Sequence, residues 1–172
     1  MSERSELTSY RPLATTIFVA LGANLGDRVA AFDRALARMR ARGIAVEAVS
    51  PYRPTRPLGG LEQPPYLNAV VRARTVLTPE ATLEALLSIE AELGRVREPA
   101  RRWAARRLDL DLLDHGGRVL RQDGLELPHP RLDQRRFVLD GLRSVAPGWR
   151  HPLTADTLDA LLVRLEEAPC RK

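Results

Sequence analysis

An alternation of leucine and aspartate, LDLDL at residues 108–112, restricts the fold of this chain more than any other feature. Successive side chains of a β-strand point to opposite faces, so Asp109 and Asp111 would share one face and the leucines the other. The pattern predicts a strand over Arg107–Leu113 whose leucine face is buried in a core. Like charges on neighbouring positions of one face repel each other, so the acidic face requires a partner of opposite charge.

Two interpretations of the acidic pair are open from these residues alone. An isolated pair with this spacing is commonly the solvated face of an edge strand. The alternative is a hard cation, since Mg²⁺ takes one or two protein carboxylates and completes its octahedral shell with water and substrate phosphate. The buried leucine face and the arginines that precede the strand favour the cation.

Arginines crowd into the 13 residues that lead into this strand: Arg95, Arg97, Arg101, Arg102, Arg106 and Arg107. They form either a solvated basic loop or a site for an anion, because a guanidinium matches phosphate oxygens with a flat fork of donors. The acidic pair beside them fits a polyphosphate better than a carboxylate. Trp103, within the cluster, is either a core anchor or a cover for a planar heterocycle, on which an aromatic ring can stack.

The charge balance excludes some classes of nucleotide site. The formal net charge is +5, and the single lysine is Lys172. A basic surface fits nucleic acid, an anionic small molecule or simple solubility, and does not choose among them. A Walker A loop and a protein-kinase site each require a lysine, so nucleotide chemistry here would have to use arginine and metal. The LGANLGDR segment, residues 21–28, is therefore interpreted as a tight strand-to-helix turn and not as a phosphate-binding loop.

Length and composition indicate one globular domain. The chain has 172 residues, of which 44% are hydrophobic, enough for a single core. Residues 1–14 are polar and lack the apolar centre of a signal peptide, so we expect a flexible leader followed by one domain over 15–172. No apolar run approaches the length of a transmembrane helix. The single cysteine, Cys170, cannot form an internal disulfide, which fits a cytoplasmic protein.

Hydrophobic periodicity, caps and turn residues predict the other elements. The first half contains a strand at Thr15–Leu21, a helix from Arg28 to about Arg42 with Asp27 as cap and Gly43 as its end, a strand at Ile44–Ser50 and an irregular loop at 51–65. A strand at Tyr66–Val76 follows, then a helix from Thr78-Pro79 to about Leu93 that ends at Gly94, an arginine-rich loop and the acidic strand. The chain continues with a hairpin-like stretch, a short helix at Phe137–Ser144 and a closing helix capped by Thr154 or Asp156. This order, β-α-β-β-α-β, predicts an α+β, ferredoxin-like core: an antiparallel sheet with helices on one face, followed by extra C-terminal helices.

The histidines and one glutamate are less specific. His129 lies between two prolines that would hold its ring in place, although a lone histidine is more commonly structural. His115 and His151 are interpreted as ordinary surface or turn residues, and no His/Cys spacing suggests zinc. Glu90 falls on the apolar face of its helix, where it either reaches solvent, pairs with Arg95, or lies at the rim of a nucleotide site.

Several motifs occur together in one order: Tyr66-Leu67-Asn68, Gly94-Arg95-Val96-Arg97, Arg102-Trp103, Arg106, Asp109-Leu110-Asp111 and Pro128-His129. In this arrangement the chain resembles the 6-hydroxymethyl-7,8-dihydropterin pyrophosphokinase family over about Thr16–Pro152. The resemblance implies a ferredoxin-like α+β fold and transfer of pyrophosphate from the co-substrate ATP to the pterin hydroxymethyl group, with release of AMP. It also implies two Mg²⁺ ions held by Asp109 and Asp111.

The resemblance carries site residues onto matching positions of this chain. It implies ATP binding by Glu90, Arg95, Arg97, Arg102, Trp103, Arg106, His129 and Arg135. It implies pterin binding by Thr55, Pro57, Leu58, Tyr66, Asn68, Trp103, Asp109 and Phe137, with the pterin between the rings of Tyr66 and Phe137. The catalytic residues would be Arg102, Arg106, Asp109 and Asp111.

Two other functions remain to be weighed against this one. A basic ferredoxin-like module could bind nucleic acid, but RNA recognition on such a sheet uses exposed stacking aromatics, and only 5% of the residues are aromatic. A Mg²⁺-dependent pyrophosphoryl or nucleotidyl transferase with another acceptor is the second alternative. We expect small-molecule partners, neither nucleic acid nor membrane, and a monomer, with a dimer as the alternative.

Overall fold

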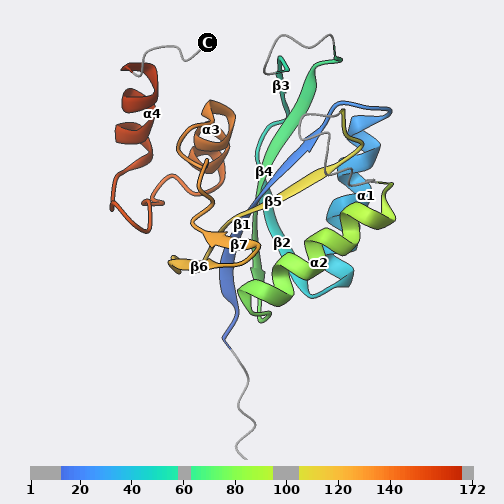
Figure 1. Cartoon of the computed structure of the whole chain (residues 1–172), viewed down its shortest axis with the longest axis horizontal. Coiled ribbons are helices and arrows are strands. Elements are labelled where there is room, and N and C mark those ends of the chain that lie inside the picture. The colour runs from blue at the N-terminus through green and yellow to red at the C-terminus, as the bar shows by residue number, and fades with distance from the viewer. Residues whose placement is uncertain (1–12, 58–62, 95–104, 168–172) are drawn as a thin grey trace, which may run out of the picture.

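The computed structural model describes residues 13–57, 63–94 and 105–167. Its centre is an antiparallel sheet with strand order β2-β4-β1-β5, and a short strand, β3, pairs with β4 (Figure 1). The strands are β1 (Thr15–Ala23), β2 (Ile44–Val49), β3 (Arg53–Thr55), β4 (Tyr66–Thr75) and β5 (Asp109–His115), with a separate hairpin of β6 (Leu120–Gln122) and β7 (Leu125–Leu127). The helices are α1 (Arg28–Ala41), α2 (Pro79–Glu92), α3 (Arg136–Val145) and α4 (Leu158–Glu167). The predicted α+β class with an antiparallel sheet is confirmed.

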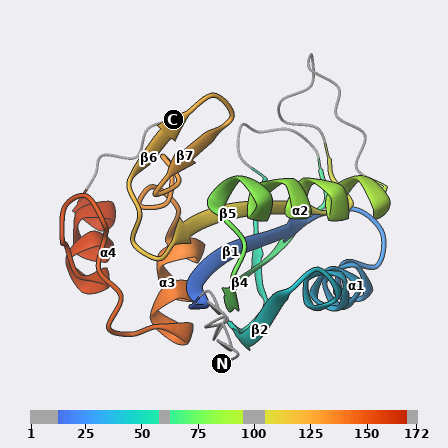
Figure 2. The same ribbon diagram turned by 90° about the horizontal axis from the view of Figure 1, so that it is seen from below.

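Helices cover both faces of the sheet (Figure 2). α1 and α2 share one core with Ile17, Val19 and Leu21 of β1. α3, with α4 against it, shares the opposite core with Phe18 and Ala20. Because β1 contributes to a core on each face, its sequence is apolar at nearly every position. The expectation of helices on one face therefore holds for α1 and α2, whereas the C-terminal helices cover the other face.

The predicted ends of the first two helices are confirmed. The side chain of Asp27 accepts a hydrogen bond from the Ala30 N–H, and that of Thr78 accepts one from the Ala81 N–H, which satisfies N–H groups that lack a partner inside the helix. The glycines that follow, Gly43 and Gly94, have φ of 77° and 88°. A left-handed residue at this position is a common helix end, and glycine adopts it without steric cost.

The predicted cap of the closing helix is wrong. α4 begins at Leu158, and the Oγ1 of Thr157 accepts a hydrogen bond from the Ala160 N–H. The predicted caps lie upstream, where Thr154 Oγ1 accepts from the Asp156 N–H. That local turn competes with helix formation, so the helix starts later than the sequence suggested.

Two strand boundaries also differ from prediction. β5 begins at Asp109 and not at Arg107, because the backbone of Arg106 bonds to the turn after β1 instead of extending the strand. Within the segment predicted to be irregular, Arg53–Thr55 forms β3 and pairs with the start of β4. Pro54 has no N–H to donate, which restricts such a strand to the edge of a sheet.

The expected leader falls almost entirely outside the described residues, of which Leu13 is the first and is exposed. Among the described helices, none combines the length and the apolar character that crossing a membrane requires.

His115 and His151, predicted to be surface or turn residues, are both buried. His151 packs edge-on against Trp149. His115 is 1% exposed at the end of β5 and donates its Nε2–H to the Leu77 carbonyl at 3.1 Å. Its Nδ1 has no hydrogen-bond partner in the described structure. Burial lowers the pKa of His115, and the hydrogen bond to Leu77 opposes this only in part.

Replacement of this buried ring should flatten the acid side of the stability profile. A histidine with a lowered folded pKa binds fewer protons in the native than in the unfolded state, so its contribution is complete above its unfolded pKa of about 6.5 and is lost as pH falls below it. We expect the unfolding free energy from urea titration to fall by less between pH 7 and pH 5 in His115→Gln, whose amide can still donate to Leu77, than in the wild type. Equal losses in both proteins would contradict this prediction.

Candidate active site

One cavity of about 820 Å³ gathers the predicted site residues. Its walls come from β1, β3, β4, β5, α2, the β6–β7 hairpin and the segment that enters α3. Every predicted site residue that the structure describes lines it: Thr55, Pro57, Tyr66, Asn68, Glu90, Arg106, Asp109, Asp111, His129, Arg135 and Phe137. The other predicted residues lie outside the described residues: Leu58, Arg95, Arg97, Arg102 and Trp103.

The strand register explains how distant parts of the chain meet in this cavity. Gly22 of β1 pairs with Asn68 of β4 on one side and with Asp109 of β5 on the other. Two positions earlier, Ala20 pairs with Asp111. A Cβ at Gly22 would lie 3.4 Å from Asn68 Oδ1 and 3.8 Å from Asp109 Cβ. The small residues of β1 therefore leave room for polar side chains from both neighbouring strands.

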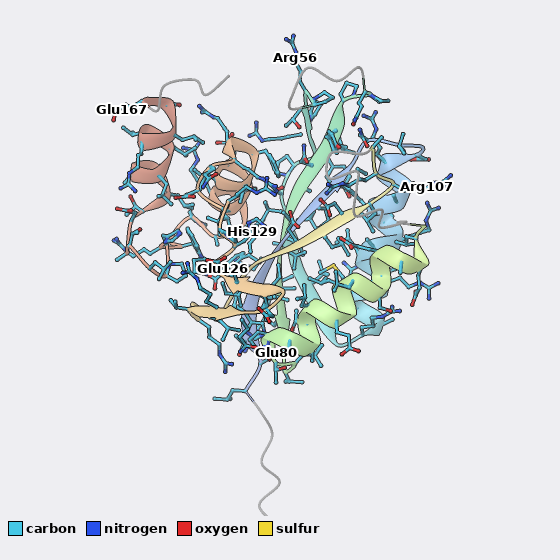
Figure 3. All side chains as sticks on the ribbon, in the orientation of Figure 1. Arg56, Glu80, Arg107, Glu126, His129 and Glu167 are labelled. Atoms are coloured by element: carbon cyan, nitrogen blue, oxygen red, sulfur yellow. The ribbon has the colours of Figure 1, made fainter. Side chains whose placement is uncertain are left out.

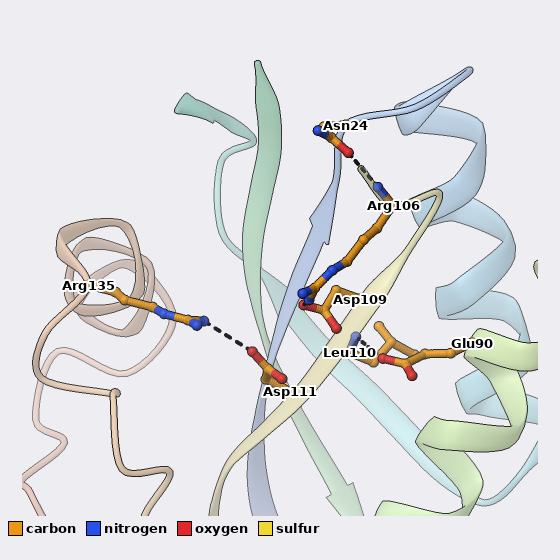
Figure 4. A network of polar contacts seen from close by, with 7 residues as sticks. All are labelled: Asn24, Glu90, Arg106, Asp109, Leu110, Asp111 and Arg135. Carbon is orange, nitrogen blue, oxygen red and sulfur yellow. Dashed lines mark hydrogen bonds and ion pairs between the residues drawn. The ribbon is translucent and has the colours of Figure 1, made fainter. Parts of the chain in front are cut away.

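The acidic pair has the orientation predicted from its alternation. Leu108, Leu110 and Leu112 are buried in the core under α1 and α2, while Asp109 and Asp111 line the cavity. Each carboxylate faces one arginine: Arg106 Nη1 lies 2.5 Å from Asp109 Oδ2, and Arg135 Nη1 lies 3.1 Å from Asp111 Oδ2 (Figure 4). Charge-assisted contacts of this kind offset the repulsion between the aspartates.

The donor set around the pair fits a cation that shares its ligands with substrate. Within the described ranges, no group of three or more His, Cys, Asp or Glu side chains is placed to hold a metal ion. Zinc and most all-protein calcium sites need such a group. Mg²⁺ does not, since one or two carboxylates suffice when water and phosphate oxygens complete its shell. The side chains of Asp109 and Asp111 keep 18% and 29% of their surface exposed, so both are open to a ligand in the cavity.

Glu90 does not reach solvent, one of the positions considered from the sequence. It is 1% exposed, and its Oε1 accepts a hydrogen bond of 2.7 Å from the backbone N–H of Leu110 (Figure 4). Leu110 is the residue between the two aspartates. Glu90 thus fixes α2 to β5 at the level of the acidic pair, while it also lines the cavity.

An amide and two aromatic rings also line the cavity. Asn68 donates from Nδ2 to Thr55 Oγ1 at 2.8 Å, which orients its side chain. Tyr66 and Phe137 both line the cavity. Burial is the largest influence on the Tyr66 phenol and raises its pKa, so this ring is uncharged at neutral pH. A lining that offers two rings and an oriented amide suits a flat, polar heterocycle.

His129 lies beside the hairpin, near Glu126 of β7 (Figure 3). Its backbone N–H donates to the Leu113 carbonyl, and its Nδ1 accepts from the Arg131 N–H at 3.1 Å. Burial lowers the pKa of His129, although Asp111 raises it in part. A neutral ring that accepts at Nδ1 carries its proton on Nε2, so His129 offers one N–H donor to the cavity that it lines.

Comparison with known proteins matches the chain to one family. A family model described as 7,8-dihydro-6-hydroxymethylpterin-pyrophosphokinase (HPPK) matches residues 18–147. The chain belongs to this family. HPPK relatives include 2-amino-4-hydroxy-6-hydroxymethyldihydropteridine pyrophosphokinases from two bacteria. That of Methylorubrum extorquens is 43% identical over 134 residues, which is 77% of this chain and 84% of the relative. That of Synechocystis is 38% identical over 149 residues, 86% of this chain and 75% of the relative.

Solved HPPK structures share the fold. Wild-type Plasmodium falciparum HPPK-DHPS with STZ-DHP has a TM-score of 0.67 and 14% identity, and the match covers 90% of this chain and 42% of that chain. The A437G form with SDX-DHP gives a TM-score of 0.69 at the same identity, over 91% and 46%. The present chain therefore spans less than half of these HPPK-DHPS chains, and the likeness concerns the fold.

Sequence reasoning missed two parts of this candidate site. The hairpin adds Gln122, Gly124 and Glu126 to the cavity lining, although its sequence indicated only a hairpin-like stretch with no part in the site. The segment after β1 adds Asn24, whose side chain bonds to Arg106. No short sequence pattern indicates either feature, because each brings together residues that are distant in the sequence.

The hydrogen bond to Leu110 predicts how this HPPK member responds to changes at Glu90. Glu90→Ala would leave a buried N–H without its acceptor, at a cost of about 1–3 kcal/mol in unfolding free energy. Glu90→Gln keeps an oxygen that can accept from Leu110, so it should lose clearly less. Urea titration of both variants measures the difference, and equal losses would show that the hydrogen bond is not what anchors this carboxylate.

Proposed function

We propose that this cavity is where the chain transfers pyrophosphate from ATP to the hydroxymethyl group of 6-hydroxymethyl-7,8-dihydropterin, giving the pterin diphosphate and AMP in folate synthesis. One observation carries the assignment to this cavity: two carboxylates on one strand face, each beside an arginine, line the same cavity as an amide and two aromatic rings. The first group suits a metal–polyphosphate and the second a flat heterocycle. The reaction joins one ligand of each kind.

Asp109 and Asp111 would hold two Mg²⁺ ions. These ions would neutralise phosphate charge and activate the pterin hydroxyl for attack. Arg106 and Arg135 lie within reach of the same carboxylates. On ligand binding these guanidiniums exchange carboxylate for phosphate oxygens and stabilise the charge spread over the transferring group. His129 adds an N–H donor, and Glu90 holds the strand in place from the core side.

Tyr66 and Phe137 would enclose the pterin ring. Asn68, oriented by its bond to Thr55, offers its Oδ1 to a pterin donor. Thr55 and Pro57 complete the wall. Holding both substrates in one geometry is the main contribution that a protein makes to phosphoryl transfer, because little covalent chemistry is required of it.

The residues outside the described ranges keep their proposed roles. Arg95, Arg97, Arg102 and Trp103 would contact ATP, with Arg102 also in catalysis, and Leu58 and Trp103 would contact the pterin.

We further propose a ferredoxin-like arrangement, supported by the strand order and by α1 and α2 on one face. Residues 15–172 would form one domain, active as a monomer in the cytoplasm.

Product analysis with matched variants tests the proposal. The protein is mixed with ATP, Mg²⁺ and 6-hydroxymethyl-7,8-dihydropterin, and nucleotides are separated by chromatography. We expect AMP only when pterin and Mg²⁺ are both present. Asp109→Asn and Asp111→Asn keep side-chain size but remove charge, and each should lower kcat by at least about 100-fold, the scale of losing one electrostatic contact to the transition state.

The control is Asp33→Asn, at an exposed position of α1, which should be fully active. ADP as product would contradict pyrophosphate transfer. AMP formation with another acceptor but not with this pterin would favour the alternative transferase. Full activity of both cavity variants would refute the metal assignment.

A further inference from the structure

The segment LGANLGDR, residues 21–28, joins the two sides of the cavity. It leaves β1 at Ala23 and enters α1 at Arg28. Asn24 lies at its centre and is only 2% exposed. Asn24 contacts two segments that are distant in sequence: Arg106, before β5, and residues 63–64, before β4. The sequence suggested a tight turn here and gave it no part in the site.

On one side, Asn24 holds the peptide groups of Arg106. The Arg106 N–H donates to Asn24 Oδ1 at 2.6 Å (Figure 4). The Arg106 carbonyl accepts from the Asn24 N–H at 2.9 Å and from the Leu25 N–H at 3.2 Å. Both polar groups of the Arg106 backbone are therefore fixed, and the side chain extends from this fixed point to Asp109.

On the other side, the same amide contacts the segment that leads into Tyr66. Asn24 Nδ2 donates to Gln63 Oε1 at 3.1 Å and to the Pro64 carbonyl at 3.4 Å. Arg28, four residues on, donates from Nη1 to the Pro65 carbonyl at 2.7 Å. The turn after β1 is thus hydrogen-bonded to residues 63–65, which directly precede Tyr66, the residue proposed to contact the pterin.

These partners fix the orientation of the amide and the residue type. The Arg106 N–H can only donate and the Pro64 carbonyl can only accept, so the Asn24 oxygen must face the first and its NH₂ group the second. Aspartate could accept from Arg106 but could not donate to Pro64. Alanine could do neither and would leave a buried N–H without its acceptor. At this position a side-chain amide meets both demands at once.

We propose that Asn24 is a positioning residue that acts on the reaction through Arg106 and ties that arginine to the pterin side of the cavity. This inference rests on the proposed function, in which Arg106 stabilises the transferring phosphate charge. The Asn24 oxygen fixes the backbone position from which the Arg106 side chain extends. The Asn24 NH₂ group holds the 63–65 segment at a fixed distance from that backbone. The two substrates are thereby held by parts of the chain that share one buried side chain.

A double-mutant cycle in kcat tests the route through Arg106. Steady-state assays that follow AMP formation are made on the wild type, Asn24→Ala, Arg106→Ala and the double variant. We expect Asn24→Ala to lower kcat about 10- to 100-fold, the scale of misplacing a catalytic group by about 1 Å. In the Arg106→Ala background the same change should have little further effect, because the group that it positions is gone.

Asn24→Asp separates the two hydrogen-bonding roles of the side-chain amide, as acceptor for Arg106 and as donor to Pro64. It keeps the acceptor for Arg106 and loses the donor to Pro64, so it should raise the KM for the pterin more than it lowers kcat. Thr75→Val is the matched control. Thr75 is also 2% exposed and makes two hydrogen bonds, to the Gly43 carbonyl and from the Leu77 N–H, but it lies at the far end of β4. It should lose stability and keep wild-type kcat and KM.

The outcomes distinguish this inference from the function on which it rests. If the wild type makes no AMP, the proposed function fails. If the wild type is active but losses at Asn24 and Arg106 multiply, or Asn24→Ala keeps full kcat, the positioning role is refuted. If Asn24→Ala fails to fold, Asn24→Asp decides: an unchanged KM for the pterin overturns the link to the 63–65 segment, and a raised KM supports it.

Discussion

Asp109 and Asp111 repel each other on the cavity face of β5, and neither can turn away, because Leu108, Leu110 and Leu112 hold the opposite face in the core. Positive charge must therefore come to them from elsewhere. Arg106 arrives from the segment just before the strand, and Arg135 from the start of α3, 24 residues along the chain. These two ion pairs connect the sheet, the 105–108 segment and the start of α3 at one cavity.

Three further hydrogen bonds support this arrangement. Glu90 bonds to the peptide between the two aspartates from the core side of the strand. Asn24 bonds to the peptide of Arg106 from the end of β1. Thr55 orients Asn68 from the edge strand β3. In each case a supporting side chain orients a residue that lines the cavity, or the backbone next to such a residue. Such support limits the motion of binding groups and favours a single geometry.

Local patterns in the sequence predicted much of this molecule. The alternation around Asp109 gave the orientation of the acidic strand, and the caps at Asp27 and Thr78 gave the starts of two helices. These features depend on neighbouring residues only. Apart from the cap of α4, which a local turn displaced, the predictions that were wrong depend on distant residues: the burial of His115 beside Leu77, 38 positions away, is an example. Likewise the link between Asn24 and Arg106 spans 82 positions, and no property of either segment alone indicates the other.

Gly22 gives the cavity a floor made of main chain. It lies in register with both Asn68 and Asp109, and a Cβ there would contact a side chain of each proposed substrate site. A larger residue here would place a side chain between Asn68 and Asp109, the residues proposed to contact the pterin and the metal ions. The polar lining of the cavity depends in this way on a side chain that the protein lacks.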